Sequence, residues 1–195
     1  MKQTVVGDVM QLSSDSAKPS IFVAFKGRWH SRVTQIFIAL FLVHWCEHVW
    51  QAIQVYVLQW PPVHSHGAIG LLVPWLNTSE WLHYSYNLII LAGLVLLRSG
   101  FEGSAKFWWS VALALQTWHF FEHALLLTQV LLHKHLFGLP IPTSILQLVV
   151  PRIELHLFYN TVVTIPVAMA LKYYFCDAKV QNQVRAMALT AMKPE

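Results

Sequence analysis

Four long apolar runs restrict what this chain can fold into. Each is about 20 residues long, the length that an α-helix needs to cross the hydrocarbon core of a bilayer. They occupy residues 33–58, 79–97, 107–132 and 152–175. Hydrophobic residues make up 56% of the chain and charged residues only 11%, a balance outside the range of ordinary soluble domains. The sequence therefore predicts an all-α integral membrane protein with four transmembrane helices.

The basic residues predict how these helices are oriented. Eleven of the thirteen Lys and Arg residues fall in the N-terminal arm (1–32), in the linker 98–106, or in and just before the tail (176–195). Only Lys134 and Arg152 lie near the opposite ends of the apolar runs. Basic residues are retained on the cytoplasmic side of membranes. We therefore expect both termini and the linker to be cytoplasmic, and the two longer connections to lie at the outer face, periplasmic or extracellular.

The polar residues inside the apolar runs repeat along the chain. One constant offset relates His44, Glu47, His48 and Gln54 to His119, Glu122, His123 and Gln129. A second, slightly shorter offset relates His83, Tyr86 and Asn87 to His156, Tyr159 and Asn160. The two units, 33–97 and 107–175, each hold two spans and so begin from the same side of the membrane. We predict a four-helix bundle built from a tandem two-helix repeat, with pseudo-twofold symmetry along the membrane normal.

Six histidines within these runs are expected at one depth. His44 and His48 lie on one face of their helix together with Glu47, because residues three and four apart are neighbours on a helix. With a rise of about 1.5 Å per residue, all six histidines fall in the outer half of the membrane. A single membrane histidine is more often a packing residue, but a repeated set at one level favours a bound cofactor.

The predicted cofactor is a pair of transition-metal ions, because imidazole is a ligand for iron, copper and zinc. The predicted ligands are His44, Glu47, His48, His83, His119, Glu122, His123 and His156. Auxiliary roles are expected for Asn87, Asn160, Gln54, Gln129, Tyr86 and Tyr159, and for the outer histidines His64, His66, His133 and His135. A carboxylate in each half favours iron, followed by copper or zinc, and the two glutamates are expected as possible bridges between the ions.

These features indicate a membrane oxidoreductase, and a non-haem di-metal oxidase or oxygenase is one form it could take. The expected partners are membrane lipid, a small or lipophilic substrate, and a redox partner or the other subunits of a complex. Two alternatives use the same residues: a b-type haem cytochrome with histidine axial ligands, and a non-catalytic metal-binding subunit of a larger complex. The basic residues form no single patch, so nucleic acid is not an expected partner.

Overall fold

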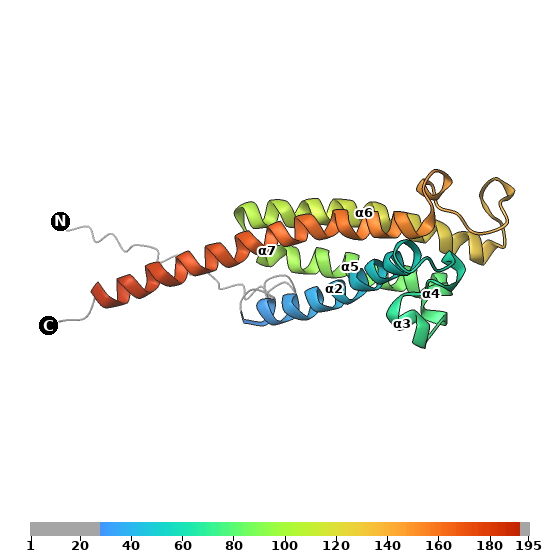
Figure 1. The fold of residues 1–195 in the computed structure, drawn as a ribbon. Helices are drawn as coiled ribbons and strands as arrows, with labels where there is room; N and C mark the ends of the chain where they lie inside the picture. The colour runs from blue at the N-terminus through green and yellow to red at the C-terminus, as the bar shows by residue number, and fades with distance from the viewer. Residues whose placement is uncertain (1–27, 192–195) are drawn as a thin grey trace, which may run out of the picture.

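A computed structural model describes residues 28–191, without the side chains of residues 28, 76, 77, 177–182 and 184–191. The predicted N-terminal arm up to residue 27, and the last four residues of the predicted tail, lie outside this range. The described chain is helical and contains no strand. Four long helices form an elongated bundle (Figure 1): α2 (Arg28–Tyr56), α5 (Glu80–Leu97), α6 (Gly103–Leu132) and α7 (Arg152–Ala191).

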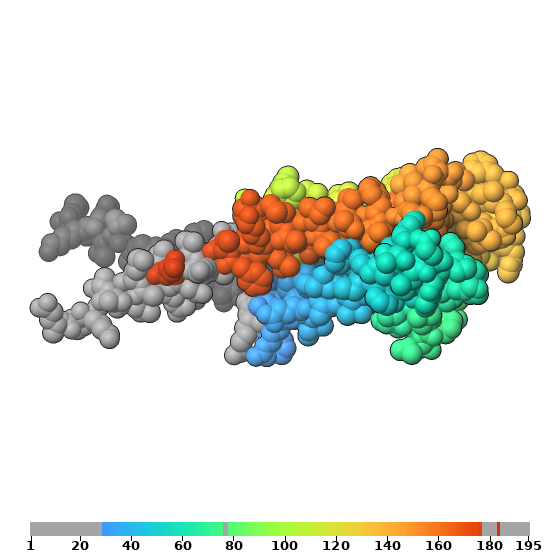
Figure 2. All heavy atoms as spheres, viewed as in Figure 1, coloured from blue at the N-terminus to red at the C-terminus, as the bar shows by residue number. Residues whose placement is uncertain are grey.

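Shorter elements fill the connections. The first longer connection contains η1 (Pro62–His64), α3 (Gly67–Leu72) and α4 (Trp75–Thr78), and the second contains η3 (Leu136–Gly138) and η4 (Leu146–Leu148). The tight turn between α5 and α6 is η2 (Arg98–Gly100). Both longer connections lie at the same end of the bundle, as Figure 1 shows. In Figure 2 the first connection, in teal and green, forms a bulge on the flank, whereas the second, in gold, extends the end.

Three described helices are long and apolar enough to cross a membrane, namely Trp29–Tyr56, Glu80–Gly100 and Arg152–Cys176. The sequence predicted four such spans. Helix α6, at 30 residues, is also long enough, but Gln116, His119, Glu122, His123 and Gln129 interrupt its apolar stretch. These polar residues lower its mean hydropathy. Whether α6 crosses a membrane, and whether the two units obey twofold symmetry, remain predictions.

Two helices extend beyond the predicted spans. Helix α2 begins at Arg28, five residues before the predicted span, and α7 continues to Ala191, well past residue 175. The stretch after residue 175 contains Ala, Lys, Arg, Gln and Met, which favour helix, and has no Gly or Pro before Pro194. Because nothing in the sequence stops the helix, the final apolar span and much of the tail form a single rod.

Below the level of the repeated histidines, the bundle has an apolar core. Its buried members include Phe37, Ile90, Leu94, Phe101 and Trp109. The Phe101 and Trp109 rings stack with their centroids 4.1 Å apart, and the Trp109 indole N–H donates to the Leu94 carbonyl at 2.8 Å. Apolar packing dominates this half of the bundle, and the histidine cluster lies in the half near the two longer connections.

Candidate metal centre

Six histidines from all four long helices form one cluster. Helix α2 contributes His44 and His48, α5 contributes His83, α6 contributes His119 and His123, and α7 contributes His156. Five of the six are buried, and His44 is half-buried. The His156 ring lies at the centre, with centroids 5.2 Å from both His48 and His123, 5.9 Å from His83 and 6.1 Å from His119.

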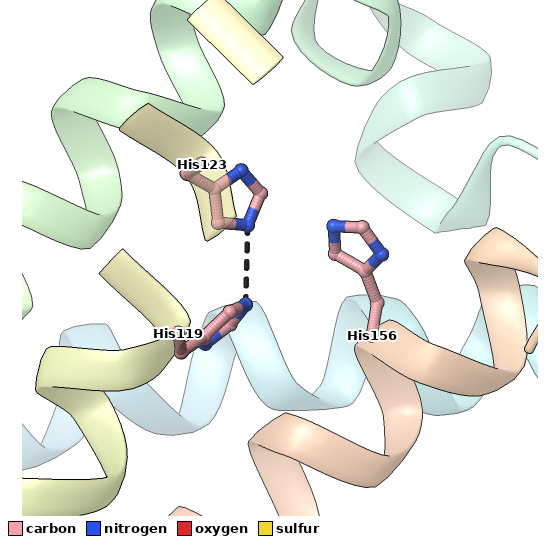
Figure 3. A group of neighbouring side chains, drawn as sticks. All are labelled: His119, His123 and His156. Atoms are coloured by element: carbon pink, nitrogen blue, oxygen red, sulfur yellow. Dashed lines mark hydrogen bonds between the residues drawn. The ribbon is translucent and has the colours of Figure 1, made fainter. Parts of the chain in front are cut away.

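Three of these histidines form a group that could hold a metal ion. Ligand atoms of His119, His123 and His156 all lie within 4.8 Å of one another. Figure 3 shows the three rings facing a common space, two from α6 and one from α7. The Nε2 atoms of His119 and His123 are 3.1 Å apart. Two nitrogens bound to one ion at about 2.1 Å would have a similar separation, so this pair needs little movement to share an ion.

Backbone carbonyls determine which nitrogen of two histidines is free. The Nδ1–H of His156 donates to the Arg152 carbonyl at 2.7 Å, and the Nδ1–H of His83 donates to the Ser79 carbonyl at 3.0 Å. A carbonyl oxygen can only accept, so Nε2 keeps its lone pair in both rings. The buried Nε2 of His156 has no hydrogen-bond partner in the described chain. A buried lone pair without a partner, on a ring oriented by a backbone carbonyl, is what a metal ligand requires.

The other half of the cluster has a second close pair. The Nε2 atoms of His44 and His48 are 3.0 Å apart, and the Nδ1–H of His48 donates to Gln51 Oε1 at 2.8 Å. That bond leaves the His48 Nε2 lone pair directed at His44, so a proton or a metal ion must lie between the two rings. The His83 ring does not stack on this pair. It lies parallel to the ring of His123, 5.8 Å away.

The two glutamates contact the outer connections. Glu47 is buried, and its carboxylate accepts backbone N–H groups from Ala68, Ile69 and Gly70 at 2.9–3.1 Å. These amides begin helix α3, where a carboxylate is favoured. Because Glu47 lies nine residues before the end of α2, about 14 Å along its axis, the first connection folds back beside the bundle. Both oxygens of Glu47 are therefore occupied, an arrangement that differs from the predicted bridge between two ions.

Glu122 is held much less firmly. One of its oxygens accepts the Leu146 N–H at a long 3.4 Å, and the other, Oε1, is buried with no hydrogen-bond partner in the described chain. Its Oε1 thus has no partner in the described chain, whereas both oxygens of Glu47 already accept backbone amides.

The predicted glutamines hold the same two connections. Gln54 accepts the Gly67 N–H at 2.8 Å and donates to the Gly67 carbonyl at 3.3 Å. Gln129 accepts the Thr143 N–H at 3.2 Å and donates to the Thr143 carbonyl at 2.9 Å. Each side-chain amide thus pairs with one backbone residue about a dozen positions later. Both glutamines thus bind the outer connections to the long helices.

The predicted tyrosines and asparagines support the histidines in matched ways. The Tyr86 ring stacks on His44 at 4.0 Å, and Tyr159 stacks on His119 at 4.5 Å. Asn87 donates to the backbone carbonyl of His83 at 2.9 Å, and the matching bond runs from Asn160 to the His156 carbonyl at 2.8 Å. The asparagines therefore stabilise the helix backbone beneath the ligands rather than the imidazoles themselves.

The outer histidines are separate from the cluster. His64 and His133 are exposed, while His66 and His135 are half-buried. His66 lines a cavity of about 520 Å³ that also reaches His48, His83 and His156. The cavity connects the buried histidines with the outer end of the bundle, and His66 is the outer histidine placed on it.

Two polar groups near the cluster were not among the predicted site residues. Gln51 orients His48, and its position three residues later on the same helical face was a signal that could have identified it. Arg152 also lines the outer cavity, and its guanidinium forms an ion pair with Glu80 at 2.6 Å. No local spacing could have revealed this pair, because its members lie far apart in the sequence and at the starts of different helices.

Comparison with protein-family models, with curated proteins and with solved structures finds no match for this chain. The inference of function therefore rests on the cluster. The arrangement offers imidazole nitrogens with free lone pairs, a buried setting, and a cavity that connects it with the outer end of the bundle. These are the chemical requirements of a metal site with an accessible coordination position.

Proposed function

We propose that the chain is a membrane metalloprotein in which the six-histidine cluster binds two transition-metal ions, and that it works as an oxidoreductase. The observation that supports this most is the group formed by His119, His123 and His156. Its donor atoms are already close together, and the Nε2 lone pair of His156 has no other partner in the described chain. A buried polar atom without a partner is costly in an apolar bundle unless a bound group uses it.

The first ion is assigned to that triad, and the second to the His44–His48 pair. The ring centroid of His156, a member of the triad, lies 5.2 Å from that of His48, so the two proposed ion sites are adjacent. Six imidazoles exceed what one ion coordinates, which supports two ions rather than one. Glu122, with its free Oε1, is the carboxylate best placed to complete the first site.

The ligand set supports copper or iron. Imidazole binds both, and both change oxidation state, as an oxidoreductase requires. The sequence favoured iron because each half offered a carboxylate. Since Glu47 binds backbone amides instead, that preference is weakened in the first half. Zinc would fit the same ligands but would exclude redox chemistry at the site, so the identity of the metal is part of the test.

Access to the cluster supports a reaction with a small molecule. The outer cavity connects His48, His83 and His156 with the end of the bundle. In this proposal α6 spans the membrane beside the three apolar helices, the termini are cytoplasmic, and electrons come from a partner, because no second redox group is evident among the described residues. When bound, the metal would supply open coordination positions and electron transfer, while the protein orients the imidazoles and excludes lipid.

The haem alternative receives less support. Axial histidines face each other across a macrocycle, and space must surround the metal on all sides. In this bundle the rings of His44 and His48 are 4.5 Å apart, those of His119 and His123 are 4.8 Å apart, and His156 lies against both groups. Neighbouring imidazoles occupy the space that a porphyrin would need.

Elemental analysis together with an optical spectrum of the purified full chain tests the proposal. About two copper or iron ions per chain are expected, without haem absorption. His156→Ala should lose most of the bound metal, whereas His133→Ala, which changes an exposed histidine on the outer connection, should keep it. Metal-free protein after reconstitution with copper and iron salts, or a haem spectrum, would overturn the proposal. A wild-type chain that holds a single ion, which His44→Ala retains, would restrict the proposal to the triad.

A further inference from the structure

A second cavity reaches the cluster from the apolar side of the bundle. It has a volume of about 220 Å³ and lies between α2 and α5. Its outer lining is aliphatic and includes Leu40, Val43 and Leu82, and its polar lining includes His44, His48 and His83. Val43 is 53% exposed and Leu40 is 42% exposed, so the cavity opens on the surface that faces lipid if these helices span the membrane.

The size and lining of this cavity restrict what can occupy it. Its volume is below the range of about 300–1,000 Å³ typical of sites for drug-sized ligands, which favours a slender chain over a fused ring system. An alkyl chain gains little by leaving lipid for an equally apolar protein surface. Selective binding must therefore depend on a polar end group that hydrogen-bonds at the histidines.

That end group should carry no charge. The acidic residue on the cavity wall is Glu47, and three backbone amides at the start of α3 already offset part of its charge, which weakens its attraction for a cationic ligand. Its negative charge also disfavours a carboxylate. No Lys or Arg is among the described residues that line the cavity. A neutral group such as a hydroxyl can both donate to and accept from the imidazoles.

The second half of the bundle has a larger side chain at the corresponding sequence position. Trp118 follows Val43 by the same offset that relates the two histidine pairs. Its indole N–H donates to the Tyr159 hydroxyl at 2.7 Å, and Tyr159 in turn stacks on His119. In the first half Tyr86 stacks on His44, but the nearby position holds the small Val43, and Tyr86 donates instead to the Leu40 carbonyl. A valine where the other half has a tryptophan leaves the space open.

We propose that the cavity between α2 and α5 is a lateral binding site for an uncharged aliphatic compound with one polar end, of the kind represented by a medium-chain alcohol. The compound enters from the bilayer with its chain along Leu40 and Val43 and its hydroxyl at the histidine end of the cavity, where His83 keeps a free Nε2 lone pair. This inference rests on the proposed function for the role of the histidines, and it identifies the substrate class of that centre. The outer cavity offers a second approach to the histidines, so two reactants reach them from different sides.

Photo-crosslinking of the full chain in lipid nanodiscs tests the site. The probe is a diazirine-bearing aliphatic alcohol, with unlabelled decanol as competitor and peptide mapping as the readout. Wild-type protein should show decanol-sensitive labelling on the α2 and α5 segments around Val43 and Tyr86. The corresponding fatty acid should label these segments more weakly. Labelling that decanol does not reduce, or that is spread evenly over exposed helix faces, would overturn the proposal.

Two reciprocal variants sharpen the experiment. Val43→Trp should abolish the decanol-sensitive labelling, and Trp118→Val should create it on α6 and α7. Leu88→Trp is the matched control, because Leu88 is an exposed α5 residue outside the cavity lining, and it should label like wild type. If Val43→Trp does not fold, Trp118→Val still decides the outcome, since failure to gain labelling would contradict the role of the tryptophan.

Metal content, measured on the same samples, separates this inference from the proposed function. Wild-type protein that binds metal but shows no competed labelling would refute the lateral site alone. Competed labelling in protein that binds no metal after reconstitution would refute the metal centre and leave the lateral site standing.

Discussion

The two helix pairs of this bundle carry the same polar residues at the same spacing, yet they are packed differently. Helices α6 and α7 contact each other along much of their length, whereas α2 and α5 touch at few places. In the second pair His119 is buried and Trp118 covers the tyrosine stacked on it. In the first pair His44 is half-buried beside an open cavity. A repeated motif can thus produce one closed, preorganised half and one open half.

The two longer connections also differ: the more firmly bonded connection belongs to the helix pair that is packed more loosely. The first connection forms two short helices and is held by three backbone amides on Glu47, while the second forms 3₁₀ turns with one long bond to Glu122. Where the helices are packed loosely, the connection is held firmly. In the first half, the bonds from Glu47 to α3 hold the connection against α2. In the second half, Glu122 has one long bond and a buried oxygen without a partner in the described chain. The two glutamates at matching sequence positions are therefore bonded differently in the two halves.

The largest expected effect is on the metal. His123→Ala removes a member of the triad, so the ion assigned there should be lost. His48→Ala should reduce metal content by about one ion and leave the triad loaded, because the two positions have separate nitrogen pairs. Metal content by mass spectrometry after gel filtration measures both. Equal and complete loss in the two variants would contradict the distinction between the halves.

The next effect is on folding stability. Glu47→Ala leaves three backbone amides without their acceptor and should lower the free energy of unfolding by about 3 to 5 kcal/mol. Glu122→Ala removes one long hydrogen bond and a partly unsatisfied carboxylate, so about 1 kcal/mol or less is expected. Denaturant unfolding of metal-free protein in one detergent compares the two. A similar loss for both variants would show that the two clamps are equally strong.

The two halves also differ in what bonds the Nδ1 atom of the second histidine of each pair, and Gln51 supplies that bond in the first half. It orients His48, whereas the residue at the same offset in the second half is Leu126, and the Nδ1 of His123 has no partner in the described chain. Gln51→Leu should weaken the metal site of the first half by about 10- to 100-fold, the usual cost of losing such an orienting bond. Leu126→Gln should strengthen the second site if its amide reaches His123. Titration against a competing chelator reports both, and unchanged affinity in Gln51→Leu would remove this residue from the site.

The smallest effect concerns two glycines of the outer connections. Gly67 and Gly138 both have positive φ, at 78° and 71°, so an alanine strains either backbone by about 1 kcal/mol. A Cβ at Gly67 would also overlap the Glu47 carboxylate, whereas a Cβ at Gly138 meets nothing within 4 Å. We expect Gly67→Ala to cost about 1 kcal/mol more than Gly138→Ala in the same unfolding experiment. If the two variants are equally stable, the contact between Gly67 and Glu47 carries no energetic weight.

Several features of the fold and site could be predicted from local rules. Helix geometry alone places His44 beside His48 and His119 beside His123, since residues four apart share a face. The rise per residue predicts that His83 and His156, on helices running the other way, reach the same level, and the structure brings all six rings into one cluster. The helical class and three membrane-competent spans follow from the length and composition of the runs.

The partners of individual atoms could not be predicted in this way. A carboxylate on the ligand face of α2 is equally able to bind a metal or a helix terminus, and the fold of the first connection brings the amides of α3 to Glu47. In the same way His83 packs against His123 rather than its own neighbour on α2. The sequence determined the helices, the shared face and the common depth, because these depend on residues a few positions apart. The tertiary structure decided which nitrogens are free, which carboxylate is engaged and which half is open, because these depend on contacts between segments distant in the chain.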